Sequence, residues 1–179
     1  MQDKLRNVAL AKGFCAGILT TLVLGGLTVW GAAALGMIPA NADAAPSALE
    51  KRFAQTALEA WLEYNTKPQE NPMAVNSANL LAGMKIYQNN CMGCHGDQKG
   101  ASAFGKAFYP PTPQFTMGRS PHDPDAIFHT LVKRGIRLTG MPAFGELLKD
   151  EEIWQVVLFV KQLSKLPPDV EAAWKNPAG

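Results

Sequence analysis

Three residues in one short stretch of the chain have the types and spacing needed to bind an iron porphyrin. Residues 91–95 read Cys-Met-Gly-Cys-His, and C-x-x-C-H is the attachment sequence of c-type haem. The thiols of Cys91 and Cys94 can form thioether bonds with the two vinyl groups of one porphyrin. The imidazole of His95 is then held beneath the iron as an axial ligand. The sequence therefore predicts one covalently attached haem c, with its iron, at these positions.

Two other uses of a Cys-x-x-Cys pair fit the chain less well. A thioredoxin-like redox pair needs a βαβ setting, whereas the flanking residues have a helical pattern. A structural zinc site needs two further Cys or His ligands, for which His122 and His129 are the candidates. Both uses leave His95 unexplained. The third cysteine, Cys15, lies far from the pair, so the chain has no disulfide framework.

An electron carrier needs a sixth iron ligand, and Met141 has the most suitable surroundings. It stands in Leu-Thr-Gly-Met-Pro-Ala-Phe, where Gly140 and Pro142 favour an extended, rigid loop that can present the sulfur atom. Ligation by His95 and Met141 would raise the reduction potential relative to two imidazoles. The other candidates for this position are Met117, His122 and His129.

Three helices are predicted around these residues, over 77–90, 123–134 and 150–164. Each has apolar residues at helical spacing, and no stretch alternates as a strand would. Gly135 is placed to end the second helix, and Asp150 is the predicted N-cap of the third. A short turn is expected near Trp174. The apolar positions are Leu80, Met84 and Tyr87 in the first helix, Ala126, Ile127, Leu131 and Val132 in the second, and Ile153, Val156, Val157, Val160 and Leu163 in the third.

A fourth helix is predicted over residues 47–64, where Ser47 and Glu50 have capping-box spacing. Pro68 and Pro72 follow it in an irregular linker. Its apolar face either packs on its own domain, or docks on a partner subunit or the membrane surface.

The N-terminal region has the pattern of a membrane anchor. No charged residue occurs between Gly13 and Ala42, and residues 14–38 are long enough to cross a bilayer as a helix. Lys and Arg residues precede this run, so the positive-inside rule places the N-terminus in the cytoplasm and the rest outside. A cleaved signal peptide is the alternative, because residues 40–42 and 42–44 resemble cleavage sites.

The stretch from Asn79 to Leu163 resembles the class I cytochrome c fold, an all-α domain around one haem. The resemblance rests on Gly83 and Tyr87, on Cys-Met-Gly-Cys-His-Gly-Asp, on the segment from Arg134 to Phe144 and on Asp-Glu-Glu-Ile-Trp at 150–154. In this family the helices before the haem motif and at the C-terminus cross closely. The resemblance implies that Gly83 permits that contact, with Trp154 and Phe159 as neighbours.

The same resemblance implies a carbonyl acceptor for the His95 imidazole, supplied by Pro113 or Pro111. An electron carrier also needs an apolar pocket for its haem. A further hypothesis is that three cations just before the Met141 loop ring the haem edge and steer an acidic partner; the alternative is that they are ordinary solvated cations. The expected pocket residues are Phe104, Phe108, Phe115, Ile136, Leu138 and Phe144, and the expected cations are Lys133, Arg134 and Arg137.

The predicted organisation is a cytoplasmic N-terminus (1–13), an anchor or signal peptide (14–38), an amphipathic helix and linker (39–76), a cytochrome c domain (77–166) and a tail (167–179). The resemblance implies a single-pass protein of the bacterial inner membrane with its haem domain in the periplasm. It would relay electrons between redox partner proteins, as a free shuttle or within a larger complex, and would not be an enzyme. The alternative is a haem enzyme or gas sensor with a displaceable sixth ligand. A net charge of +2 gives no support for nucleic-acid binding.

Overall fold

The computed structural model describes residues 2–116, 121 and 123–176 of the 179-residue chain. The chain divides into two compact units, Met1–Ala44 and Ala45–Gly179. Within the described residues the secondary structure is helical, with one isolated bridge between Asp97 and Gly100 and no strand. The prediction of an all-α fold is therefore confirmed.

The first unit is built around one long helix, α1 (Gln2–Ala34). Its segment Arg6–Ala34 is long and apolar enough to cross a membrane, a character that it shares with signal sequences. The helix begins earlier and ends earlier than the predicted span of 14–38. It stops before Gly36, whose φ of +70° leaves the helical region.

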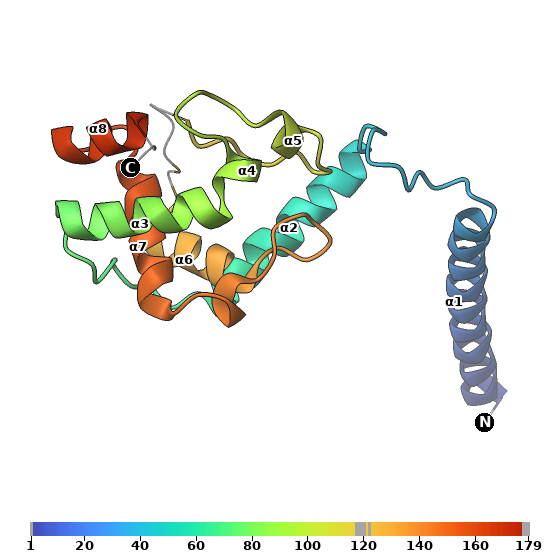
Figure 1. Ribbon diagram of the computed structural model, residues 1–179. Coiled ribbons are helices and arrows are strands. Elements are labelled where there is room, and N and C mark those ends of the chain that lie inside the picture. The colour runs from blue at the N-terminus through green and yellow to red at the C-terminus, as the bar shows by residue number, and fades with distance from the viewer. Residues whose placement is uncertain (1, 117–120, 122, 177–179) are drawn as a thin grey trace. The chain divides into compact units, whose positions relative to one another are not determined.

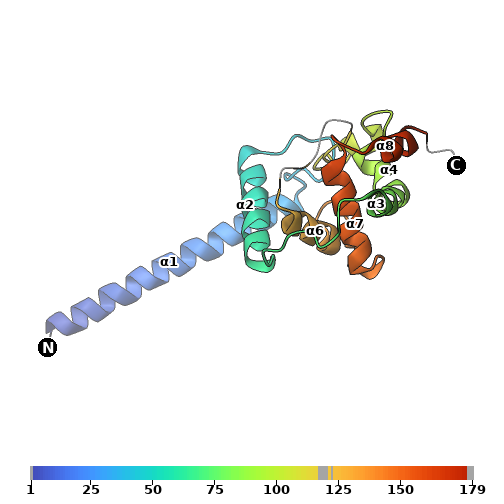
Figure 2. The ribbon, with the colours of Figure 1, turned by 90° about the vertical axis from the view of Figure 1, so that its left-hand side faces the viewer.

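The second unit begins with α2 (Ala48–Asn65). The Ser47 side chain accepts a hydrogen bond of 3.1 Å from the Glu50 N–H, as the capping pattern predicts. Figures 1 and 2 show α2 at the edge of the helical unit, next to α6 (Asp125–Arg134). Leu62 is the residue of α2 that is buried in this packing.

The core forms where α3 (Ser77–Asn90) crosses α7 (Asp150–Gln162), as Figure 1 shows. A Cβ atom on Gly83 would lie 2.1 Å from the Gln155 carbonyl oxygen and 2.9 Å from the Phe159 Cβ. Glycine is therefore required at the crossing, because any side chain would push the helices apart. The predicted close crossing is confirmed, but the residues that meet Gly83 are Gln155 and Phe159, and Trp154 is not among its three nearest contacts.

The ends of α6 and α7 differ from the predictions by one or two residues. Pro124 is the N-cap of α6, with an extended backbone, so the helix starts at Asp125 and not at Asp123. Lys149 is the N-cap of α7, which corrects the assignment of Asp150. The Glu152 carboxylate accepts a hydrogen bond of 2.7 Å from the Lys149 N–H, which is the bond that the N3 residue makes in a capping box.

The C-terminal segment forms a helix, α8 (Pro168–Lys175), where the sequence suggested only a turn. Its Trp174 side chain is fully buried beside Tyr87 and Phe159, with ring centroids 5.7 and 5.3 Å away. This aromatic group joins α8 to the crossing of α3 and α7. The remaining short elements are α4 (Met92–His95), α5 (Ala103–Lys106) and the 3-10 turn η1 (Phe144–Glu146).

Candidate haem site

The short helix α4 places the three residues of the haem motif on neighbouring positions of one turn. Cys91 caps the end of α3, and its carbonyl accepts hydrogen bonds from Cys94 N–H (3.1 Å) and His95 N–H (2.9 Å). Residues three and four apart lie on the same side of a helical turn. Cys91 and Cys94 are free thiols. Burial, and next the charge of Cys94, raises the pKa of Cys91 to about 12, so this thiol is protonated at neutral pH.

The orientation of the His95 imidazole is fixed by a backbone carbonyl. Its Nδ1 lies 2.8 Å from the Pro113 oxygen, so Nδ1–H donates and Nε2 is left to bind a metal. Of the two expected acceptors, Pro113 and Pro111, the structure selects Pro113. Burial lowers the pKa of His95 while the Pro113 bond opposes that shift, and the net lowering favours the neutral, metal-binding form.

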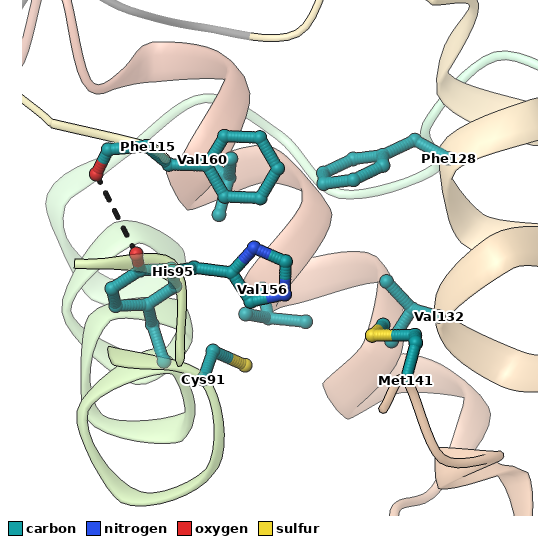
Figure 3. Close-up of a pocket in the computed structure, with 9 residues that line it drawn as sticks. Cys91, His95, Phe115, Phe128, Val132, Met141, Val156 and Val160 are labelled. Carbon is teal, nitrogen blue, oxygen red and sulfur yellow. Dashed lines mark hydrogen bonds between the residues drawn. The ribbon is translucent and has the colours of Figure 1, made fainter. Parts of the chain in front are cut away.

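Met141 and His95 line the same cavity. Figure 3 shows the Met141 sulfur atom pointing toward the side of the cavity where His95 lies, with the Cys91 sulfur pointing into the same space. The free space within this cavity is small, about 30 Å³. Its lining residues are Tyr87, Cys91, His95, Phe115, Phe128, Val132, Met141, Val156 and Val160.

Tight backbone contacts hold the loop that carries Met141. Gly135 ends α6 with a φ of +66°, and a Cβ atom there would lie 2.7 Å from the Met141 carbonyl oxygen. The same oxygen accepts a hydrogen bond of 3.1 Å from Ile136 N–H. The Met141 N–H donates to Thr139 Oγ1 at 3.1 Å. These contacts fix the position of the Met141 backbone and so restrict the positions that its sulfur atom can reach.

The cavity lining differs from the set expected from the sequence. Of the six expected residues, Phe115 lines the cavity, with its ring stacked 4.8 Å from that of His95. Phe144 is buried in the core, Ile136 is half-buried, and Phe108 packs against Phe104 and lies beside Gly140. Phe104 and Leu138 are 66% and 93% exposed. Helical periodicity predicted that Val132, Val156 and Val160 face the core, but it did not show that they border the cavity. Phe128 also lines the cavity and was not predicted.

Of the three alternative sixth ligands, the structure describes His129, and this residue does not line the cavity. His129 is buried and stacks on Trp154, with ring centroids 3.9 Å apart, and its Nε2 lies 3.2 Å from Asp150 Oδ1. Met117 and His122 lie outside the described residues. Across the described part of the chain, no group of three or more His, Cys, Asp or Glu residues could hold a bare metal ion.

The three cations expected near the haem edge differ in their surroundings. Lys133 Nζ lies 2.6 Å from Asp150 Oδ1, so this charge is used in an ion pair between α6 and α7. Arg134 and Arg137 are exposed.

The donor set fits haem c. Two free thiols stand three residues apart, one imidazole nitrogen is available for iron, and a thioether points into the same apolar cavity as the imidazole. Such a combination of soft sulfur and imidazole donors suits haem iron and does not suit a hard oxygen-binding cation.

Comparison with protein families agrees with this chemistry. The model of the family "Cytochrome C oxidase, cbb3-type, subunit III" matches residues 78–160. This segment runs from α3 through most of α7 and includes Cys91, Cys94, His95 and Met141. A search of the curated proteins found no match to the chain.

The fold and the donor set thus define a haem-binding electron-transfer domain. Residues 78–160 form a domain of the cytochrome c family. The chain accordingly carries covalently bound haem c with its iron, functions in electron transport, and has a candidate membrane anchor at its N-terminus.

Proposed function

We propose that this protein is a one-electron carrier with a single haem c, attached through Cys91 and Cys94 and ligated axially by His95 and Met141. The observation that carries the proposal is that His95 and Met141 line one apolar cavity while Pro113 holds the imidazole. The sequence has one C-x-x-C-H motif, and Cys15 has no cysteine partner at that spacing. The bound haem supplies a reversible change between ferric and ferrous iron.

The residues of the chain have three tasks in this proposal. The Pro113 carbonyl keeps the His95 tautomer and ring orientation constant. The contacts of Gly135, Ile136 and Thr139 keep the Met141 thioether in place. Apolar side chains exclude water, which favours fast electron transfer because little solvent must reorganise.

Optical spectra of the purified protein in both redox states test the ligand assignment. A Met–iron bond gives a weak charge-transfer band in the ferric state, and thioether attachment keeps the haem on the chain after denaturation and acid extraction. Loss of the haem on extraction, with both thiols open to alkylation, would contradict the proposal.

Addition of carbon monoxide to the reduced protein separates the carrier from the alternative of a haem enzyme or gas sensor. A carrier with a firmly held Met141 binds carbon monoxide slowly or not at all, whereas a displaceable ligand permits rapid binding.

The proposed location is the periplasmic face of a bacterial inner membrane. The proposed parts are residues 1–13 in the cytoplasm, 14–38 across the membrane, 39–76 as helix and linker, 77–166 as the haem domain and 167–179 as the tail. Support comes from the cations that precede the apolar run and from the apolar character of Arg6–Ala34. Intact mass of the mature protein tests this, since cleavage near residue 42 would remove the anchor.

The proposed partners are redox proteins of the same membrane. The name of the matched family refers to a subunit of a cytochrome c oxidase, which supports a place within a respiratory complex as well as a free shuttle. The anchor would raise the effective concentration of either kind of partner. Co-purification of stoichiometric subunits in mild detergent would favour the complex, and isolation of the chain alone would favour the shuttle.

A further inference from the structure

Helix α2 presents a row of large apolar side chains to solvent. Leu49, Phe53 and Tyr64 are 78%, 75% and 88% exposed, and Trp61 at the margin of the row is 41% exposed. By contrast, Leu62 on the same helix is 8% exposed and belongs to the packed side. Apolar side chains gathered in this way on a surface mark a site of interaction.

The exposed row and the packed side lie on opposite sides of the helix. Successive residues of an α-helix are about 100° apart, so Leu49, Phe53 and Tyr64 fall on one side, together with two small residues, Ala57 and Ala60. The half-buried Leu58 and the buried Leu62 fall on the other side. We call the row Leu49, Phe53, Ala57, Ala60 and Tyr64 the outer stripe. It is not required for packing against the rest of the helical unit, so it is available for another surface.

We propose that the outer stripe lies in the interface of the bilayer, with the axis of α2 parallel to the membrane. This inference rests on the proposed membrane anchoring. Thirteen residues, 35–47, separate the end of α1 at Ala34 from the start of α2 at Ala48. Their fully extended reach is about 45 Å, so the start of α2 stays within that distance of the end of α1. The exposed aromatic residues Phe53, Trp61 and Tyr64 are of the types that favour the bilayer interface.

The charges of α2 indicate what kind of lipid surface it suits. The helix has two cations and three anions, Lys51, Arg52, Glu50, Glu59 and Glu63, which leaves a net charge of −1. The carboxylate nearest the stripe, Glu50, accepts a hydrogen bond from the Tyr109 hydroxyl. Attraction to anionic headgroups therefore cannot be the main force, and burial of the stripe among neutral, zwitterionic headgroups should suffice.

A protein surface is the other occupant to consider. The carboxylate nearest the outer stripe, Glu50, is already bonded to the Tyr109 hydroxyl, so a protein partner would find little charge there with which to set its register. The membrane, in contrast, is present wherever the anchor is inserted. These observations favour lipid over protein.

Site-directed spin labelling of the full-length holoprotein in phosphatidylcholine nanodiscs tests the proposal. In a Cys15→Ser background, a nitroxide is attached at Phe53→Cys or Tyr64→Cys on the stripe, and at Glu59→Cys as the matched control on an exposed position away from it. The Cys91 and Cys94 thiols are unreactive in the holoprotein because they are in thioether bonds. Accessibility of each label to oxygen and to a water-soluble nickel chelate is then measured against the same labelled protein without either reagent, so that any relaxation by the haem iron cancels.

We expect the labels at 53 and 64 to be accessible to oxygen and shielded from nickel, and the label at 59 to be accessible to nickel. Added anionic lipid should change this pattern little. If all three labels were equally accessible to nickel, the stripe would lie in water and the proposal would be wrong. Shielding from both reagents would show a protein cover, such as a second copy, and would also overturn it. Co-elution of the chain with the discs checks the anchor separately, so failure of the anchoring is distinguishable from failure of the stripe.

Discussion

Gly135 and Met141 touch through their backbones: a Cβ atom on Gly135 would lie 2.7 Å from the Met141 carbonyl oxygen. Gly135 also has a left-handed backbone, with a φ of +66°, that side-chain-bearing residues rarely adopt. The end of α6 and the proposed ligand loop are therefore built against each other, and the position of the thioether depends on a residue that carries no side chain.

Gly135→Ala should weaken the proposed Met141–iron bond. The substitution adds strain of about 1–3 kcal/mol and pushes the Met141 carbonyl away. The charge-transfer band of the ferric protein should diminish. Replacement of Met141 by another ligand should also occur at a lower pH than in the wild type. Gly100→Ala is the matched control, since Gly100 also has positive φ (+141°) but a Cβ atom there would have nothing within 4 Å; an equal spectral effect there would show that crowding of Met141 is not the cause.

Met141→Ala should remove the charge-transfer band altogether and lower the reduction potential, because the thioether ligand raises that potential. It should also open the sixth position of ferrous iron to carbon monoxide. Optical titration with carbon monoxide measures the second effect. The control is Met84→Leu, a substitution of similar volume at a buried core methionine that does not line the cavity. An unchanged spectrum in Met141→Ala would exclude this residue as a ligand.

Gly83→Ala should destabilise the domain, since the new methyl group would overlap the Gln155 carbonyl at the crossing of α3 and α7. Overpacking of this kind lowers the free energy of unfolding by about 1–3 kcal/mol or more. Urea unfolding of the holoprotein gives this value. The same substitution at Gly93, where nothing lies within 4 Å, should have no such effect; equal losses at both positions would refute the crossing as the cause.

Tyr87→Phe should cost about 1–3 kcal/mol of unfolding free energy. The Tyr87 side chain is fully buried, and its hydroxyl donates a hydrogen bond of 2.7 Å to the carbonyl of Gly96, directly after His95. Without the hydroxyl, this buried carbonyl loses its partner. Tyr64→Phe, at an 88% exposed position, is the comparison and should change stability less. Unfolding curves followed by circular dichroism provide both values.

Stability should fall as pH is lowered through the range below about 6.5, the ordinary pKa of histidine. Burial lowers the pKa of His129, so the unfolded chain binds this proton more readily than the folded one. The stability linked to His129 is therefore complete above its unfolded pKa and decreases as pH falls toward its folded pKa. Asp150, whose pKa is lowered first by its bond to Lys133, acts in the same direction at more acidic pH.

His129→Phe tests this assignment, because phenylalanine can keep the stacking on Trp154 but cannot titrate. The free energy of unfolding should then vary less between pH 7 and pH 5 than it does in the wild type. Urea titrations at several pH values measure it, and an unchanged slope would assign the pH dependence to other groups.

Local features of the chain were predictable because they depend on residues that are close together in the sequence. The haem motif is contiguous, and a single helical turn is enough to bring Cys91, Cys94 and His95 together. The extent of α3 and the Ser47 cap of α2 followed from periodicity and capping chemistry alone. The end of α6 at Gly135 was likewise predictable, since helices commonly end at a glycine in the left-handed conformation.

Contacts between distant segments were decided by the tertiary structure. Pro111 and Pro113 are equivalent in sequence terms, yet packing of the segment before Phe115 selects Pro113 for His95. The burial of Trp174 depends on a surface formed by α3 and α7 together, so the short C-terminal segment alone did not predict α8. Periodicity identifies an apolar face, but it does not say which part of that face borders a cavity, and for this reason Val156 and Val160 were seen only as core residues. Sequence determines local geometry through short-range sterics and hydrogen bonds, whereas the partners of each face are chosen when all the helices pack at once.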